Sequence, residues 1–267
     1  MLIFPNAKIN LGLNIVSKRD DEFHNIETFF IPVKELADAL EFIPSKKTVL
    51  TLSGIDIEGN PADNMVLKAY YLLKEPFDLP PLSIHLHKFI PAGAGLGGGS
   101  SDASFMLKAL KDYFNLPIEN KEMLELAGRL GSDCAFFVIN KPALARGKGE
   151  ILQPIEMELK GRHYLIIKPY FSVNTRDAYS GVQPAQPMHS LADLIKLPMA
   201  EWKDSIRNDF EPSVFKRFPE LGIIKQAMYE MDAIYAAMSG SGSAIFGIFD
   251  ALPEIPVLPD RYFCWKS

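Results

Sequence analysis

The chain has 267 residues, of which 48% are hydrophobic and 23% charged, and its formal net charge is −5. This composition excludes a disordered chain, and the length is sufficient to bury one large core or two smaller ones without disulfide crosslinks. Residues 1–150 carry a net charge of −3 and residues 151–267 one of −2. Because neither part is basic, we expect no nucleic-acid partner and no polybasic membrane surface.

The N-terminal sequence and the cysteines predict a cytoplasmic location. The first ten residues, MLIFPNAKIN, contain no basic stretch followed by an apolar one, so no signal peptide is expected. The longest apolar stretches are too short to span a bilayer. Two cysteines, Cys134 and Cys264, are too few for a disulfide framework, which favours a reducing compartment. Both a monomer and a homodimer are compatible with this sequence.

The N-terminal part is predicted to be rich in strands. Apolar and polar residues alternate over residues 7–16, which places Lys8, Asn10 and Gly12 on one face of a strand and aliphatic side chains on the other. The same reasoning predicts further strands at residues 28–33, 39–42, 48–52 and 82–89.

Four helices are predicted between residues 60 and 140. The first covers residues 65–74, with Asp63 as its N-cap and Pro76 as its break. Apolar side chains at helical spacing predict a second helix that ends near Phe114. The third begins at Asn120 and stops at Gly131, and a short fourth helix covers residues 134–138.

The charged segment 156–162 has no clear periodicity, and we place the boundary between two domains, residues 1–155 and 156–267, at its start. After it, apolar runs predict strands at residues 164–168, 233–238 and 244–249, and a helical stripe spans residues 221–231. Helices and strands are mixed without regular βαβ alternation, so an α+β fold is expected.

The glycine-rich segment, residues 91–101 with the sequence PAGAGLGGGSS, is the most unusual part of the chain. Clustered glycines indicate backbone that needs positive φ angles or close approach to a ligand. The predicted helix that follows would offer free N–H groups and a favourable dipole to an anion. A flexible surface turn is the competing interpretation, but the predicted strand and helix hold both ends. The segment therefore predicts a phosphate site.

Three phosphate-binding patterns were compared with this segment. A Walker A loop fits the spacing of Gly93 and Gly98, but the next residue is Gly99 instead of lysine. The dinucleotide pattern G-x-G-x-x-G fits at Gly93, Gly95 and Gly98, yet no acidic residue follows at a second strand end about twenty residues later. The pattern P-x-x-x-G-L-G-[SG]-S matches at Pro91, Gly95, Leu96 and Gly97, and Ser100-Ser101 supply its serine after one additional glycine.

With this last pattern the sequence resembles the GHMP kinase superfamily and, within it, the 4-diphosphocytidyl-2-C-methylerythritol kinase family of the non-mevalonate isoprenoid pathway. The motifs that carry the resemblance are NAKINL at 6–11, Phe23-His24, the glycine-rich segment, LGSD at 130–133, NDFE at 208–211 and MSGSGSA at 238–244. The resemblance implies a two-domain fold, ribosomal protein S5 domain 2-like at the N-terminus and ferredoxin-like at the C-terminus, with the site between the domains. It also implies that the chain phosphorylates the 2-hydroxyl of a cytidine-diphosphate-linked methylerythritol with ATP, and Mg²⁺ is expected.

The catalytic residues that the resemblance implies are Lys8 and Asp133. Asp133 would accept the hydroxyl proton, and the Lys8 ammonium would keep it ionised and offset charge on the transferred phosphoryl group. Taken alone, Asp133 also suits a helix N-cap and Lys8 a solvent-facing strand position.

The substrate-binding positions implied by the resemblance are Asn10, Phe23, His24 and Tyr179. Aromatic faces and a histidine suit the flat, hydrogen-bonding cytosine ring, although both aromatic residues also suit an ordinary core. This chain has Glu22-Phe23 where the family has Gly-Tyr, so a hydroxyl contact is lost and the loop is less free.

The resemblance implies that the whole glycine-rich segment binds ATP. The members of this segment are Pro91, Ala92, Gly93, Ala94, Gly95, Leu96, Gly97, Gly98, Gly99, Ser100 and Ser101. Three residues outside the segment, Asn64, Met65 and Lys88, are also implied to bind ATP. The late glycine-serine segment, residues 239–243, is expected to abut this loop, although a tight turn would use the same residues.

No metal ligand is assigned. His85 and His87 share one strand face, but no third ligand follows at a suitable spacing. Three other functions would also use the glycine-rich segment: a homoserine or mevalonate kinase of the same superfamily, a dinucleotide-binding oxidoreductase, and a nucleotide sensor without activity.

Overall fold

The computed structural model describes residues 1–57, 59–157, 159 and 161–267. The chain forms two compact units whose segments alternate along the sequence. Unit 1 comprises Met1–Lys8, Pro32–Ala92 and Gly97–Lys141, and unit 2 comprises Ile9–Ile31, Gly93–Leu96 and Pro142–Ser267. The division into domains at 155/156 stays a prediction, and residues 158 and 160 of the boundary segment 156–162 lie outside the described residues.

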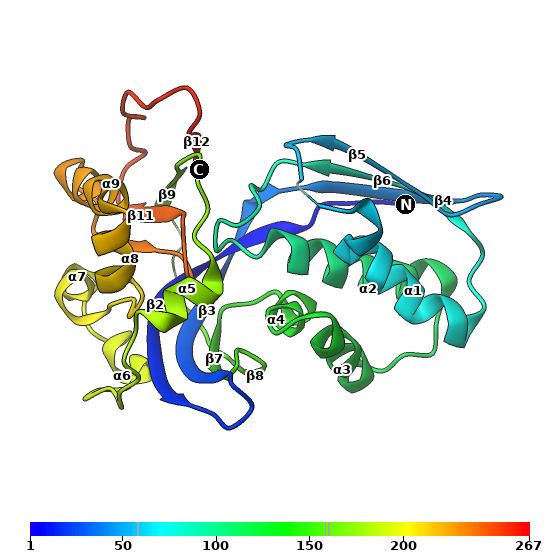
Figure 1. Ribbon diagram of the computed structural model, residues 1–267, viewed down its shortest axis with the longest axis horizontal. Helices are drawn as coiled ribbons and strands as arrows, with labels where there is room; N and C mark the ends of the chain where they lie inside the picture. Colours follow the sequence, from blue (N-terminus) through cyan, green and yellow to red (C-terminus); the bar gives the residue numbers. More distant parts are fainter. Residues whose placement is uncertain (58, 158, 160) are drawn as a thin grey trace. The chain divides into compact units, whose positions relative to one another are not determined.

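Unit 1 is built on a four-stranded sheet with helices along one face (Figure 1). Its strand order is β1 (Leu2–Ile3), β4 (Ala39–Pro44), β6 (Leu82–Lys88) and β5 (Val49–Gly54). Strand β5 runs parallel to β6, whereas β4 is antiparallel to it. Alternate residues of these strands, such as Leu40 and Ile84, are buried in the core against the helices. The intervening residues, such as Glu41, lie on the exposed face.

The helices of unit 1 confirm the predicted elements. They are η1 (Pro61–Asp63), α1 (Met65–Phe77), α2 (Gly98–Phe114), α3 (Asn120–Leu130) and α4 (Cys134–Ile139). Gly131 is the C-cap of α3, as predicted.

Both ends of α1 differ from the prediction. The N-cap is Asn64, whose side chain accepts the N–H of Val66, because Asp63 belongs to the preceding 3₁₀ turn. Pro76 lies inside the last turn of α1 instead of ending it. A proline removes only one backbone hydrogen bond, so near the C-terminus the helix continues to Phe77.

Unit 2 contains an antiparallel sheet in the order β10 (Tyr235–Met238), β11 (Ile245–Phe249), β9 (His163–Lys168) and β12 (Phe263–Lys266). Helix α9 (Pro219–Glu230) covers β10 and β11, with Leu221, Ile224 and Met228 in the core (Figure 1). The other helices of this unit are α5 (Thr175–Ser180), α6 (Leu191–Leu194), η2 (Met199–Glu201), α7 (Trp202–Ser205) and α8 (Glu211–Arg217).

A third sheet has the order β2 (Asn6–Lys18), β3 (His24–Ala37), β7 (Ala143–Gly147) and β8 (Ile151–Pro154). Strand β2 confirms the alternating strand of the sequence, but residues 6–13 are buried on both faces. The polar face with Lys8 and Asn10 is therefore not a solvent-facing surface. Among the described residues, no helix is both long and apolar enough to cross a bilayer.

Candidate active site

The backbone of the glycine-rich segment adopts the conformation for which glycine is required. Gly93, Gly95 and Gly97 have φ angles of 61°, 76° and 72°. Gly97 occupies the N-cap position of α2, and no side chain there accepts a hydrogen bond from the first turn. The N–H groups at the start of α2 are thus left for an anion, as a phosphate site requires.

Within unit 2, the first half of this segment lies directly on the glycine-serine segment 239–243. The Ser239 hydroxyl donates to the carbonyl oxygen of Gly95 at 2.8 Å, and the N–H of Ala244 donates to Ala94 at 3.0 Å. A Cβ atom on Gly95 would lie 2.8 Å from the carbonyl carbon of Ser239 and closer still to its oxygen. The expected contact between the two segments is present.

The NDFE motif holds the glycine-serine segment in place. The Asn208 side chain donates to the carbonyl oxygens of Met238 and Gly240 at 2.7 and 2.8 Å. The Glu211 carboxylate accepts the N–H of Met238 at 2.8 Å. In the sequence this motif contributes to the family resemblance but has no predicted role. In the structure, Asn208 and Glu211 position the glycine-serine segment.

Lys8 and Asp133 are neighbours in unit 1. The Lys8 Nζ atom lies 3.4 Å from Oδ2 of Asp133, whose side chain is 33% exposed. Although Asp133 occupies the N-cap position of α4, its carboxylate makes no capping hydrogen bond. The solvent-facing interpretation of Lys8 is wrong, whereas Asp133 stands at the predicted cap position without using its side chain as a cap. A partly exposed carboxylate beside a buried ammonium is suited to accept a proton.

The position of Asp133 is fixed by packing between α2 and α4. The Ser104 hydroxyl on α2 lies 2.7 Å from the carbonyl oxygen of Ser100 and 2.8 Å from that of Cys134. Because Cys134 follows Asp133 directly, this contact holds the start of α4 against the first turn of α2.

Asn10 lies in a buried polar network of unit 2. Its amide nitrogen donates to Thr28 at 3.0 Å, and its backbone N–H donates to the Ser239 hydroxyl at 3.3 Å. Asn10 is therefore placed beside the glycine-serine segment, and its role in substrate binding stays a prediction.

Two of the predicted aromatic contacts lie together in unit 2. The rings of His24 and Tyr179 are stacked, with centroids 4.6 Å apart and an interplanar angle of 16°. Phe210 meets Tyr179 edge-on at 4.8 Å. Phe23 is 55% exposed, and the Lys148 ammonium lies 4.7 Å from its ring centroid. The ring stack thus consists of His24 and Tyr179, while Phe23 offers a separate exposed face.

Burial lowers the pKa of His24 below its ordinary value, and the charge of Lys18 lowers it further. The imidazole is therefore neutral at pH 7 and presents one donor and one acceptor. The turn before it includes Glu22, whose φ angle is 64°. This left-handed conformation favours glycine, which is the residue that the resembled family has there.

The residues assigned to ATP outside the glycine-rich segment have other contacts in unit 1. Asn64 caps α1, and Met65 lies 3.8 Å from where a Cβ atom on Gly99 would stand. Lys88 is buried in ion pairs with Asp38 and Asp102. The roles of Asn64, Met65 and Lys88 toward ATP stay predictions.

His85 and His87 both lie close to one hydroxyl. The Ser53 Oγ atom is 2.8 Å from Nε2 of His85 and 2.9 Å from Nδ1 of His87. Across the described part of the chain, no group of three or more His, Cys, Asp or Glu side chains is arranged to hold a metal ion.

Comparisons with known proteins agree with this arrangement. The family model described as "GHMP kinases N terminal domain" matches residues 64–141, and "GHMP kinases C terminal" matches residues 190–255. A protein of Bacteroides fragilis (strain YCH46) named 4-diphosphocytidyl-2-C-methyl-D-erythritol kinase is 50% identical over 100% of this chain and 99% of its own length.

The chain belongs to the 4-diphosphocytidyl-2-C-methyl-D-erythritol kinase family. A member from Cytophaga hutchinsonii is also 50% identical, over 95% of this chain and 94% of its own. A crystal structure of 4-(cytidine 5'-diphospho)-2C-methyl-D-erythritol kinase matches with a TM-score of 0.78 and 32% identity, covering 93% of this chain and 90% of that one. The expected α+β GHMP kinase fold is therefore confirmed.

Other kinases share the fold of this family without close sequence similarity. A homoserine kinase from Cytophaga hutchinsonii matches with a TM-score of 0.65 at 18% identity, over 92% of this chain and 86% of that one. The mevalonate kinase of Methanococcus jannaschii matches with a TM-score of 0.64 at 13% identity, over 93% and 90%. At these identities the likeness concerns the fold alone.

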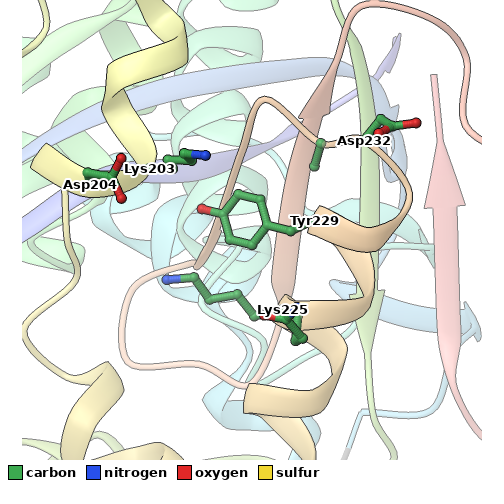
Figure 2. A pocket seen from close by; sticks show the side chains of 7 residues that line it. Lys203, Asp204, Lys225, Tyr229 and Asp232 are labelled. Atoms are coloured by element: carbon green, nitrogen blue, oxygen red, sulfur yellow. The ribbon is translucent and has the colours of Figure 1, made fainter.

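One polar cavity of unit 2, with a volume of about 550 Å³, is lined by none of the residues that match the kinase family's motifs. Figure 2 shows Lys225 and Tyr229 extending from α9, with Lys203 and Asp204 on α7 nearby. Lys225 is paired with Glu211 at 2.6 Å. None of the residues predicted to bind ATP or substrate lines this cavity, so we assign it no part in the kinase reaction.

Proposed function

We propose that this chain transfers the γ-phosphoryl group of ATP to the 2-hydroxyl of 4-(cytidine 5'-diphospho)-2-C-methyl-D-erythritol. The observation that carries the proposal is the 50% identity to kinases named for this substrate over the full length of the chain. The stack of His24 and Tyr179 supports it, because a flat ring system and a neutral imidazole suit a cytosine base.

In the proposed reaction the acceptor hydroxyl attacks the γ-phosphorus and ADP leaves with the bridging electron pair. The Asp133 carboxylate takes the hydroxyl proton, and Lys8 offsets the negative charge that develops on the transferred group. Backbone N–H groups of residues 93–101 hold the phosphates.

Mg²⁺ is part of this proposal as the ion that accompanies ATP. When bound, it neutralises phosphate charge. In many phosphoryl-transfer sites this ion is held by substrate phosphates together with one or two carboxylates, and such a site needs no dedicated protein cluster. This fits the described residues, which hold no group of three acidic or histidine ligands. The first turn of α2 also contains a buried Ser101 hydroxyl with no hydrogen-bond partner, which is an oxygen suited to such an ion.

The substrate side of the proposal rests on Asn10, Phe23, His24 and Tyr179. The cytosine ring would lie against the aromatic faces, and His24 would contact its hydrogen-bonding edge. We further expect a cytoplasmic protein that acts on small molecules as a monomer or homodimer, without nucleic-acid or membrane partners.

A coupled ADP-release assay with ATP and Mg²⁺ tests the proposal with three acceptors: the cytidylyl methylerythritol compound, mevalonate and homoserine. Turnover with the first acceptor alone is the expected result. Turnover with mevalonate or homoserine would retain a GHMP kinase and refute the cytidine pocket. Absence of turnover with all three would refute the proposed activity, and titration with NADH would then test the dinucleotide-binding alternative.

A further inference from the structure

Three charged side chains of unit 1 that the proposed reaction does not use are buried together. The Lys88 Nζ atom lies 2.7 Å from Oδ2 of Asp102 and is also paired with the Asp38 carboxylate. The exposed fractions of the Lys88, Asp38 and Asp102 side chains are 4%, 0% and 3%. Charges at such depth are retained only where partners compensate their desolvation.

The three residues come from segments that meet at the two ends of the glycine-rich segment. Lys88 ends β6, three residues before Pro91. Asp38 lies between β3 and β4, and its Oδ1 atom accepts the N–H groups of Phe89 and Ile90 at 2.6 and 2.8 Å. The chain that enters the glycine-rich segment is therefore tied to Asp38 by its backbone as well as by Lys88.

Asp102 lies on α2, directly after the last residue of the glycine-rich segment. The packing there is close: a Cβ atom on Gly98 would lie 3.2 Å from the Lys88 ammonium and 3.0 Å from Ile90. The helix start and the strand end are thus joined through one ammonium group, and the loop between them has both ends attached to the same buried cluster.

The charges of this cluster do not balance if every group is ionised. Two carboxylates and one ammonium leave one buried negative charge, and Oδ1 of Asp102 has no hydrogen-bond partner. Burial raises the pKa of Asp102 to about 8; Lys88 opposes this shift and Asp38 adds to it. Burial lowers the pKa of Lys88, but Asp102 and Asp38 outweigh this effect and raise it. The charges of Lys88 and Asp102 thus depend on one another, and the loss of either residue leaves the other without its buried partner.

The elements packed against α2 bring no other charge to Asp102. Helices α1, α3 and α4 cover α2 with apolar side chains, among them Met123. Their titratable groups close to this core are Tyr70, which donates to the carbonyl oxygen of Pro80, and the Cys134 thiol, whose pKa is raised by burial. Lys88 and Asp38 are the charged groups that act on Asp102.

We propose that Asp38, Lys88 and Asp102 form a positioning network that fixes both ends of the glycine-rich segment for ATP binding. The proposal rests on the proposed kinase function, since it assigns the segment to ATP. It gives Lys88 a role in holding the loop instead of direct contact with the nucleotide.

Two substitutions at Asp102 test its hydrogen bond to Lys88. Asp102→Asn keeps the shape and an oxygen that can accept from the Lys88 ammonium, so the KM for ATP should stay within about twofold of the unmodified protein. Asp102→Leu breaks the bond to Lys88, and the displaced loop should raise the KM for ATP by about tenfold or more, with a smaller change in the KM for the acceptor. Asp112→Asn, at an exposed position of the same helix, is the matched control and should change neither constant.

The contrast between the two variants is the readout that a merely structural role would not move, because it appears in the KM for ATP and much less in the KM for the acceptor. If Asp102→Asn weakens ATP binding as strongly as Asp102→Leu, the hydrogen bond to Lys88 does not hold the loop and the network is refuted. If Asp102→Leu binds ATP normally, the positioning role is refuted.

Direct titration of ATP by calorimetry keeps this test separate from the proposed activity. If no acceptor is phosphorylated, the kinase function fails, yet the ATP affinities of the same variants still decide on the network. Should Asp102→Leu fail to fold, Asp102→Ala, which also removes the hydrogen bond to Lys88, takes its place in the same comparison.

Discussion

Replacing Gly95 by alanine tests whether the glycine-rich segment depends on its contact with the glycine-serine segment. Two costs follow from the structure. The φ angle of 76° costs an alanine about 1 to 2 kcal/mol relative to glycine. The new Cβ would also lie 2.8 Å from the carbonyl carbon of Ser239 and closer still to its oxygen, so the two backbones must separate by more than the roughly 0.6 Å that ordinary contact with the carbon alone would require.

That separation stretches the 2.8 Å hydrogen bond from the Ser239 hydroxyl to Gly95, which is worth about 1 kcal/mol. The free energy of unfolding of Gly95→Ala should therefore fall by about 2 to 3 kcal/mol, which lowers the Tm by about 4 to 12 °C. Because displacements near 1 Å cost about a hundredfold in rate, kcat/KM for ATP should fall by about that factor.

Gly128→Ala is the matched control, since no atom lies within 4 Å of the added Cβ and the residue lies inside α3. Its stability should rise by about 0.5 to 1 kcal/mol with unchanged kinetics. Thermal unfolding and steady-state kinetics with varied ATP measure both effects. A Gly95→Ala protein with the Tm and ATP kinetics of the parent would refute the argument that this glycine permits the backbone approach.

Three further predictions concern single residues of the site. Asp133→Asn should lower kcat by about 10² to 10⁴ while the KM for ATP changes little; steady-state turnover near that of the parent would contradict its role as base. Because the pKa of His24 lies below its ordinary value, the KM for the cytidylyl acceptor should be constant from pH 8 to about 6.5 and rise at lower pH as the imidazolium forms. His24→Gln should abolish that rise, and an unaltered profile would exclude His24 as its source. Glu22→Gly should relieve the φ angle of 64° and raise the free energy of unfolding by about 0.5 to 1 kcal/mol in urea titrations, and a loss of stability would show that this backbone is not strained.

Local patterns in the sequence were sufficient for most elements of unit 1. The alternation over residues 7–16 predicts β2, and the clustered glycines predict the positive φ angles before α2. Both signals are local, because periodicity and glycine content act on neighbouring residues. The sequence predicts the N-cap of α1 one residue too early, at Asp63, because asparagine and aspartate both suit a cap and only the 3₁₀ turn decides between them.

Contacts between distant segments were beyond the sequence patterns. The alternating pattern around Lys8 suggests a lysine that faces solvent. Only the fold shows that Lys8 is buried and lies beside Asp133. Strand β12 was not predicted, since its four residues become a strand by pairing with β9. The burial of Lys88 between two carboxylates likewise depends on segments 50 and 14 residues away.

The interleaved order of the two units has a consequence for how the chain folds on the ribosome. Unit 1 is complete once Lys141 has been synthesised, whereas unit 2 needs both the early segment Ile9–Ile31 and β12 near the end. At about 5 to 20 residues per second, the early segment waits roughly 10 to 50 seconds for its last partners. During that time its apolar residues are open to chaperones and to association with other nascent chains, so we expect the yield of folded protein to depend on translation rate.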